Sequence, residues 1–431
     1  MEHHHPRVKP SLPTDAAGLA PPRGGWPAYE SDHLFLLMGG NPLPNAVAAL
    51  TLLRPGGMAH IIHTDQTQVQ AENLGRLLAG EAGFETAPLI NLGRAQAAAA
   101  VIRGQVQQRA VGLRGQVGMN YTGGTKPMAV HAYRALAAVC PGAIFSYLDS
   151  NTTKITLDCD HGPSQQIPLV VDLSLAQMFQ LHGLRWHPDY PPLTEPLLPA
   201  AATALAQCYQ DWELVQNWRH WCRTTLLPAL KQGQDWKPLW QLRNLAPLPL
   251  AGLAAPLVEL LQTHLGASAT ELDLITLLPL GFGDLTQVGN WLDGVWLEHY
   301  ALDQVGQLAQ AYRLREVGLG FQMVDSAGPP GRYGRFEFDL AFCQGHQLFA
   351  LSCTTATARW GCKQKLLEAA VRARQLGGSE ARVGLVCGYP WSENLRRELE
   401  VMGRDRRVAV FGRQDWPQLA ENIAEWIETN G

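Results

Sequence analysis

Apolar runs alternate with helix-patterned segments over the first third of the chain, and this alternation restricts the possible folds more than any other feature. The periodicity predicts strands at 33–38, 58–64, 87–91, 115–121 and 143–149, and helices at 44–53, 68–80, 94–107 and 127–139. Strands that alternate with helices form a parallel sheet covered by helices on both faces. Such sheets bind ligands beyond the carboxyl ends of their strands. We therefore expect an α/β fold with a ligand site at that edge.

Three polar loops each follow a predicted strand. They are "MGGNPLPN" (38–45), "HTDQT" (63–67) and "NYTGGTK" (120–126). Because the carboxyl ends of parallel strands share one edge of the sheet, we expect the three loops to lie together there. Their convergence predicts a site large enough for a nucleotide.

The loop "NYTGGTK" is a strand-to-helix turn. Pro127 suits the first helical turn, where its missing N–H is not needed. The backbone N–H groups of such a turn and the helix N-terminus attract anions, phosphate above all. The spacing matches neither an ATP-binding Walker loop nor the G-x-G-x-x-G dinucleotide turn. A phosphate site and a tight turn capped by Thr125 are therefore equally supported by the residues alone.

Composition excludes several classes of protein. The formal net charge of -4 argues against a globally basic nucleic-acid binder, although a local basic groove remains compatible with it. The 8 cysteines are scattered with no C-x-x-C pair, which argues against a structural zinc site or a disulfide scaffold and predicts a cytoplasmic protein. We find no apolar run near the roughly 18 residues of a membrane span, and we expect no membrane association. Residues 1–32 are expected to form a flexible arm.

The pattern changes after residue 180. We assign 33–180 to the first domain, closed by a predicted hairpin at 153–160 and 166–175. Residues 181–285 are predicted to be a mostly helical connector rich in tryptophan, whose indoles are more suited to filling a core than to stacking on bases. Residues 286–431 follow the order helix (289–309), hairpin (334–342 and 346–355), helix (362–378) and strand (381–388). That order is typical of restriction-endonuclease-like nucleases.

Two carboxylates mark the predicted hairpin. In "FEFDLAF", Glu337 and Asp339 share one strand face and the phenylalanines point the other way. Carboxylates beside an apolar strand are costly to bury unless something neutralises them. A divalent cation is one solution, and a partner such as Arg332 or Arg335 is the other.

The next strand lacks the acid-x-Lys pair that nucleases of this type carry there. Ser352 and Thr354 stand at those positions, and neither hydroxyl replaces a carboxylate or a lysine charge. Lys363 and Lys365 open the following helix on opposite sides of its apolar stripe, so we expect only one of them to reach the carboxylates. Glu298 is a further candidate acid or a surface salt-bridge partner. Glu368 is expected on the outer face of the helix.

Together, these motifs resemble the CRISPR ancillary nucleases that join a CARF (CRISPR-associated Rossmann fold) domain to a restriction-endonuclease-like domain. The resemblance rests on "PLPN", "NYTGGTKPM" and "LSLAQMFQLHG" in the first half, and on "GVWLEHY", "FEFDLAF" and "KQKLLEAAVRARQLGG" in the second. It covers most of residues 33–431. It leaves out the N-terminal arm and much of the tryptophan-rich connector.

The resemblance implies a homodimer that binds a cyclic oligoadenylate, commonly cyclic tetra-adenylate, and then cleaves DNA or RNA with Mg²⁺ or Mn²⁺. The implied ligand positions are Asn41, Pro44, Asn45, Thr64, Asn120, Thr122, Gly123, Gly124, Thr125 and Lys126. The implied catalytic positions are Glu298, Glu337 and Asp339, with Ser352 at the acid position and Lys363 or Lys365 as the cation; Glu337 and Asp339 would hold the metal. A non-catalytic sensor is the alternative, and a slow hydrolase of the cyclic ligand is a weaker one.

Overall fold

The computed structural model describes residues 28–80, 84–94, 98–149, 154–158, 164–326, 336–403 and 407–430. Most of the expected N-terminal arm, and both Arg332 and Arg335, lie outside these residues, as does the side chain of Glu337. The chain forms two compact units, of which the first ends at Leu184 and the second begins at Arg185. The finer division into four segments stays a prediction.

The N-terminal unit is built on one sheet with the strand order β3-β2-β1-β5-β6-β7-β8, and β4 also pairs with β2. The strands are β1 (Ser31–Leu37), β2 (Leu53–His63), β3 (Glu85–Thr86), β4 (Ile90–Asn91), β5 (Val117–Asn120), β6 (Ile144–Asp149), β7 (Lys154–Leu157) and β8 (Gln165–Pro168). The strands from β1 to β6 pair in parallel, and β7 and β8 close the sheet as an antiparallel hairpin. The predicted α/β fold with a parallel sheet is confirmed.

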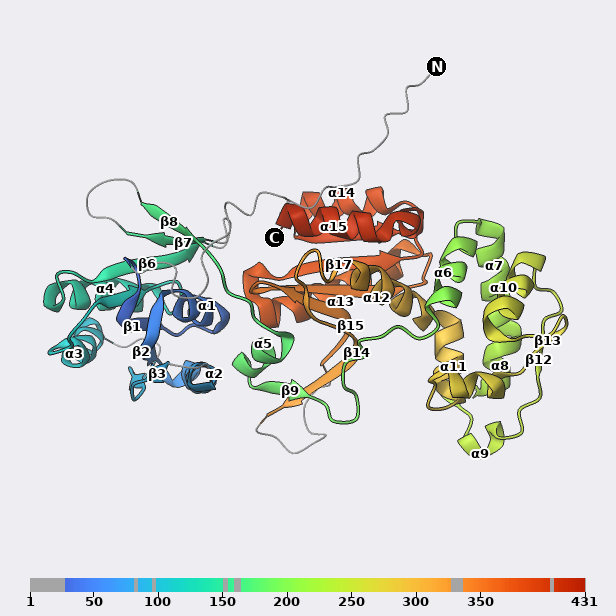
Figure 1. The fold of residues 1–431 in the computed structure, drawn as a ribbon, viewed down its shortest axis with the longest axis horizontal. Coiled ribbons are helices and arrows are strands. Elements are labelled where there is room, and N and C mark those ends of the chain that lie inside the picture. The colour runs from blue at the N-terminus through green and yellow to red at the C-terminus, as the bar shows by residue number, and fades with distance from the viewer. Residues whose placement is uncertain are drawn as a thin grey trace, which may run out of the picture. The chain divides into compact units, whose positions relative to one another are not determined.

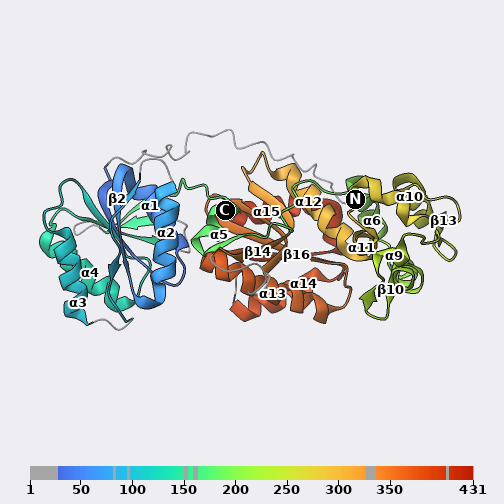
Figure 2. The same ribbon diagram turned by 90° about the horizontal axis from the view of Figure 1, so that it is seen from below.

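Helices cover both faces of this sheet. They are α1 (Leu43–Leu52), α2 (Gln68–Gly80), α3 (Ala99–Ala110), α4 (Lys126–Val139) and α5 (Leu175–Leu181). Figure 2 shows α1 and α2 on one side of the strands and α3 and α4 on the other. Phe35 and Leu37 of β1 pack with Ile102 of α3 and Met128 of α4 in one buried cluster. Since successive side chains of a strand alternate between faces, Leu34 and Leu36 are buried on the opposite side.

The C-terminal unit contains a second sheet with the order β18-β17-β16-β15-β14-β9 (Figure 1). Its strands are β9 (Leu184–Trp186), β14 (Arg315–Asp325), β15 (Phe336–Gln344), β16 (Gln347–Thr354), β17 (Arg382–Cys387) and β18 (Val408–Gly412). Strands β14, β15 and β16 are antiparallel, whereas β16, β17 and β18 are parallel. The mixed sheet therefore has β15 and β16 at its centre.

Four helices sandwich the second sheet. Helices α12 (Trp296–Leu308) and α15 (Leu419–Asn430) lie on one face, and α13 (Arg359–Gly377) and α14 (Ser392–Gly403) lie on the other (Figure 2). The predicted helix at 289–309 is interrupted: α11 (Leu285–Asn290) leads into α12 through a π turn, Trp291–Val295. The predicted helix at 362–378 is α13, and the strand at 381–388 is β17.

The helical segment expected to be a connector packs into the same core as the second sheet. It comprises α6 (Pro199–Cys208), α7 (Trp212–Trp221), a π turn at Cys222–Leu226, α8 (Leu227–Leu230), α9 (Leu239–Leu242) and α10 (Ala255–Leu265), with short β-pairs at 231–236 and 248–272. Tyr209 contacts Trp296 and Trp416 at ring-centroid distances of 4.9 and 5.6 Å. All three side chains are buried, so they tie the helices to the sheet.

Among the described residues, no helix is both long and apolar enough to cross a membrane.

Trp416 tests the shared core. Because its side chain is fully buried between Tyr209 and Trp296, Trp416→Ala should lower the free energy of unfolding by about 3–5 kcal/mol. Trp240 is 69% exposed, so Trp240→Ala serves as the matched control and should change it by less than about 0.5 kcal/mol. Guanidinium denaturation followed by circular dichroism measures both. Equal effects of the two substitutions would contradict this account of the core.

Candidate functional sites

The three polar loops of the N-terminal unit meet at one edge of its sheet. β1 lies between β2 and β5, and Leu36 pairs with Ile61 on one side and Asn120 on the other. The three strands therefore end level with one another. A Cβ added to Gly39, in the first loop, would lie 3.2 Å from the backbone nitrogen of Gly124, in the third. The predicted juxtaposition of the loops at residues 38–45 and 120–126 is thus present.

Glycine is required where the third loop crosses the end of β1. A Cβ on Gly123 would lie 2.2 Å from the Leu37 carbonyl oxygen and 2.9 Å from Nδ2 of Asn45. Gly124 has a φ of +75°, a conformation that L side chains rarely adopt. The loop backbone therefore approaches the first loop more closely than any side chain would permit.

Several predicted ligand positions are buried and hold the loops in place. Nδ2 of Asn45 donates to the Leu37 carbonyl oxygen at 2.9 Å. Asn120 donates from Nδ2 to Oγ of Ser146 at 3.1 Å and accepts at Oδ1 from the Thr122 N–H at 3.2 Å. Thr64 is also buried. The direct bonds of Asn45 and Asn120 are thus to the protein itself.

The remaining predicted positions face solvent to different degrees. Thr125 and Lys126 are exposed, and Asn41, Pro44, Gly123 and Gly124 are half-buried. Oγ1 of Thr125 accepts from the Met128 N–H at 3.4 Å and so caps α4, while Oγ1 of Thr122 accepts from the Leu148 N–H at 2.6 Å. The capped turn that the sequence left open is present. Its half-buried glycines and exposed Lys126 lie at a helix N-terminus, where an anion would be stabilised.

In the C-terminal unit, Asp339 is held by the neighbouring strand. Its Oδ2 accepts from Oγ of Ser352 at 2.7 Å and from the Cys353 N–H at 2.8 Å. Oδ1 accepts no hydrogen bond from the residues that the structure describes. The carboxylate is half-buried, so one oxygen is fixed by protein and the other remains available to a cation or a substrate group.

A small cleft beside Asp339 brings helix α13 to the two strands. Phe338, Asp339, Leu351, Ser352, Lys365, Glu368, Ala369 and Arg372 line it. Its volume is about 20 Å³, room for a single water molecule. Among the residues that the structure describes, Lys365 lines this cleft and Lys363 does not. The structure thus places Lys365, rather than Lys363, beside Asp339.

Glu368 is exposed, as expected for a solvated helix glutamate, and accepts from Nε2 of Gln364 at 3.0 Å. It also lines the cleft beside Asp339. Lys365, Glu368 and Arg372 recur at three- and four-residue spacing, which places them on one helix face. That spacing is visible in the sequence and would have revealed Arg372, which was missed.

Glu298 and Lys365 also lie near the buried thiol of Cys353. Burial raises the pKa of Cys353 well above its usual value, and the charges of Asp339 and Glu298 raise it further while Lys365 lowers it. These charged groups therefore surround one point at the end of β16. No three His, Cys, Asp or Glu side chains converge as a metal site within the described ranges, which omit the side chain of Glu337.

Comparison with known proteins finds solved structures with a similar fold. No family model and no curated protein matches the sequence. Protein VC1899 from Vibrio cholerae superimposes with a TM-score of 0.66 at 17% identity, over 93% of this chain and 99% of that one. Can2 from Sulfobacillus thermosulfidooxidans, in complex with cyclic tetra-adenylate, gives 0.63 at 14% identity, over 92% and 99%. A type III CRISPR defence DNA nuclease activated by cyclic oligoadenylate aligns more loosely, with a TM-score of 0.48 at 17% identity over 83% and 45%. The fold predicted from the resemblance is confirmed.

Gly123 tests the packing of the third loop. Gly123→Ala should lower the free energy of unfolding by about 1–3 kcal/mol, because its Cβ would overlap the Leu37 carbonyl oxygen. Gly142→Ala is the matched control, since a Cβ there would meet nothing within 4 Å. Thermal unfolding of both variants, with hydrogen exchange at residues 120–126, measures the effect. A Gly123→Ala protein as stable and as protected as the control would contradict the geometry.

Proposed function

We propose that this protein is a metal-dependent nuclease of type III CRISPR defence that is activated by cyclic tetra-adenylate. The observation that carries the proposal is the fixed carboxylate of Asp339, with one oxygen free and Lys365 beside it, in a sheet of restriction-endonuclease order. The likeness of the whole fold to Can2 in complex with cyclic tetra-adenylate supports the choice of activator.

The activator would bind at the edge of the N-terminal sheet. Gly123 and Gly124 offer backbone N–H groups to the phosphates, and Lys126 supplies a positive charge at the start of α4. Asn45 is fully buried and donates from Nδ2 to the Leu37 carbonyl oxygen, so it would hold the first loop in place rather than contact the ring. Asn120 and Thr122 would act by holding the loop rather than by contact.

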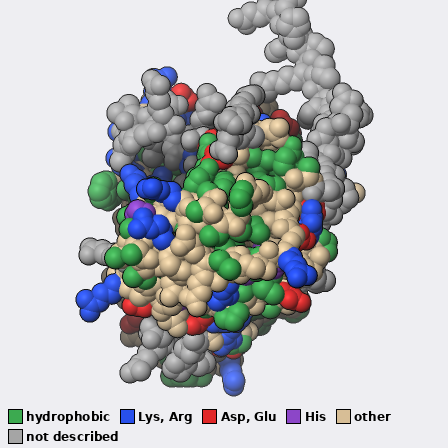
Figure 3. Space-filling view, turned by 90° about the vertical axis from the view of Figure 1, so that its left-hand side faces the viewer, with side chains coloured by type: hydrophobic (Ala, Val, Ile, Leu, Met, Phe, Trp, Pro, Cys, Tyr) green, Lys and Arg blue, Asp and Glu red, His purple; other side chains and the backbone are tan. Residues whose placement is uncertain are grey.

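We further propose a homodimer that binds one ring. Three valines near α3 and α4 are exposed and would contribute to this interface: Val101 on α3, Val111 directly after it and Val130 on α4. Figure 3 looks onto the side of this unit that carries α3 and α4, where apolar side chains lie among lysines and arginines. A mixed surface of this kind suits an interface between copies that must also admit an anionic ligand.

In the nuclease site, Asp339 and Glu337 would hold Mg²⁺ or Mn²⁺, which prefer carboxylate oxygens. Such an ion, when bound, lowers the pKa of its water and makes it a nucleophile. The Ser352 hydroxyl orients Asp339, and Glu298 contributes negative charge at the same strand end. Lys365 would neutralise charge that develops on the scissile phosphate, the role left empty by Thr354.

A second candidate is a non-catalytic sensor whose C-terminal unit binds nucleic acid without cutting it. The observation that favours it is the hydrogen bond from Ser352 to Asp339. Among the described residues that line the cleft, Asp339 is the one carboxylate carried by a strand, and this bond already satisfies one of its oxygens. The 20 Å³ of the cleft admits an ion with its waters only after the side chains move. Cleavage assays separate the two functions.

Plasmid DNA and RNA, incubated with Mg²⁺ or Mn²⁺ and with or without cyclic tetra-adenylate, test the nuclease. We expect cleavage that depends on the ring and is abolished by Asp339→Ala, since the metal site is already short of one acid. Glu259→Ala, at an exposed position on α10, is the matched control and should cut like wild type. If wild type cuts and Asp339→Ala cuts equally well, the assignment of this strand is wrong. A wild type that never cuts but binds the ring would favour the sensor.

Lys126 tests the ring site by isothermal titration calorimetry. Lys126→Ala should weaken binding of cyclic tetra-adenylate by about 1–3 kcal/mol, the size of a hydrogen bond to a charged group. Arg134→Ala, at an exposed position of the same helix, should bind like wild type. The titration should also give one ring per two chains. One ring per chain, or equal affinity of the two variants, would refute the proposed site.

A further inference from the structure

A large cavity in the C-terminal unit lies between α7 and the end of β16 with the residues that follow it. Its volume is about 1010 Å³, the upper end of the roughly 300–1,000 Å³ typical of small-molecule sites. Ten residues between Trp212 and Leu227 line one wall, and Thr354, Thr355, Ala356 and Thr357 line the other. Thr354 shares a strand face with Ser352, which binds Asp339. The cavity therefore opens at the end of the strand that carries the proposed nuclease site.

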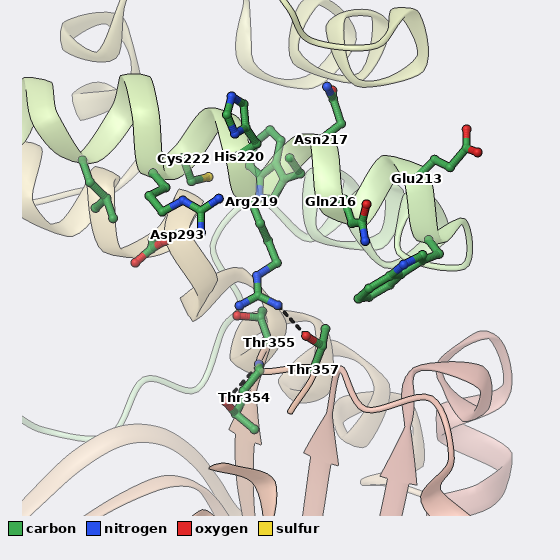
Figure 4. A pocket seen from close by; sticks show the side chains of 15 residues that line it. Glu213, Gln216, Asn217, Arg219, His220, Cys222, Asp293, Thr354, Thr355 and Thr357 are labelled. Carbon is green, nitrogen blue, oxygen red and sulfur yellow. Dashed lines mark hydrogen bonds between the residues drawn. The ribbon is translucent and has the colours of Figure 1, made fainter. Parts of the chain in front are cut away.

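One face of α7 and its continuation presents cations to this cavity. Gln216, Arg219, His220 and Arg223 recur at three- and four-residue spacing, which places them on a single helix face, and all four line the cavity and are exposed. Figure 4 shows Arg219 reaching from α7 toward Thr355 and Thr357, and its Nη1 donates to Oγ1 of Thr357 at 2.6 Å. Within the described residues, its other N–H groups and all those of Arg223 donate to no protein atom.

Two π turns frame the cavity. Cys222–Leu226 interrupts the helix that carries Arg219, and Trp291–Val295 interrupts the helix before α12. They are in contact, since Sγ of Cys222 lies 3.8 Å from the Leu292 carbonyl oxygen. π turns inside α-helices are frequent at functional sites. Both contribute lining residues here, Arg223 from one and Asp293 from the other.

The cavity is not uniformly basic. Glu213 and Asp293 also line it. Burial raises the pKa of Asp293, whereas the charges of Lys231 and Arg219 lower it. The proximity of Arg219 to Asp293 and its bond to Thr357 hold the guanidinium in place, while its remaining N–H groups stay available to an anion.

An aromatic side chain marks one end of the cavity. Trp212 is 42% exposed, and the Arg413 guanidinium lies 5.1 Å from its ring centroid, which fixes the indole by a cation–π contact. Exposed indoles beside arginines are the elements with which proteins bind single-stranded nucleic acid, since bases stack on the rings and phosphates bind the cations.

We propose that this cavity binds the single-stranded nucleic-acid substrate, with Arg219 and Arg223 on its phosphates and Trp212 against a base. The inference rests on the proposed function, since the cavity would guide the bound nucleic-acid strand toward Asp339. It also assigns a role to the helical segment: α7 supplies cations near Thr354, where the sheet itself offers a hydroxyl in place of a lysine.

Fluorescence anisotropy tests the inference without requiring cleavage. Labelled oligodeoxythymidine and oligouridine are titrated with the full-length protein plus cyclic tetra-adenylate in EDTA, over a series of salt concentrations. The combined variant Arg219→Ala/Arg223→Ala should bind at least one of the two about tenfold more weakly than wild type. The slope of log affinity against log salt should also become shallower by about 0.7 for each arginine lost. Arg219→Lys/Arg223→Lys should recover most of the slope.

Two further variants complete the test. Arg243→Ala is the matched control, since this exposed arginine is not among the residues that line the cavity. Arg223→Glu repeats the test at a side chain that donates to no described group, so its effect is independent of the Thr357 contact. Unchanged affinity and slope in both cavity variants, or a wild type that binds neither oligonucleotide, would overturn the inference. If the wild-type protein binds an oligonucleotide but cleaves neither DNA nor RNA, the proposed nuclease activity is overturned and the strand-binding cavity remains supported.

Discussion

A carboxylate at the centre of a sheet needs hydrogen-bond donors or a cation, and at Asp339 the neighbouring strand provides the donors. Oδ2 is satisfied by Ser352 and by the Cys353 N–H, so the acid stays in place whether or not a cation is present. The same bonds fix the direction of Oδ1. The strand pairing of β15 with β16 therefore determines where a cation could bind, where Lys365 must reach, and which end of the sheet faces the large cavity.

The two candidate sites are constructed differently. The N-terminal site is built largely from backbone, because Gly123 and Gly124 allow the third loop to lie against the end of β1. The C-terminal site is built from side chains on three elements, β15, β16 and α13. Backbone donors suit a ligand of fixed shape and repeated phosphates, whereas side chains on separate elements suit chemistry in which charge must be balanced during a reaction.

Sequence periodicity located the central strands of the N-terminal sheet, because β1, β2 and β5 carry runs of buried apolar residues. It did not resolve the predicted strand at 87–91 into the separate short strands β3 and β4. It located Asp339 and Ser352 on adjacent strands, since a period of two fixes the face of each side chain. It could not choose between Lys363 and Lys365, because a helix's rotation about its axis depends on packing. Arg219 was missed for a different reason: it lies well over a hundred positions from β16 in the chain, and only tertiary contact brings it to Thr357.

The π turn at Cys222–Leu226 affects how this sequence could change. A π turn contains one residue more than the α turn it replaces, so a single-residue deletion there would restore regular α-helix. The helical segments on either side would keep the orientation that their packing fixes, and the deletion would remove one side chain of the turn, for example that of Arg223. A deletion within this turn could therefore remove one cation of the pair Arg219 and Arg223 without disturbing the helix on either side of it.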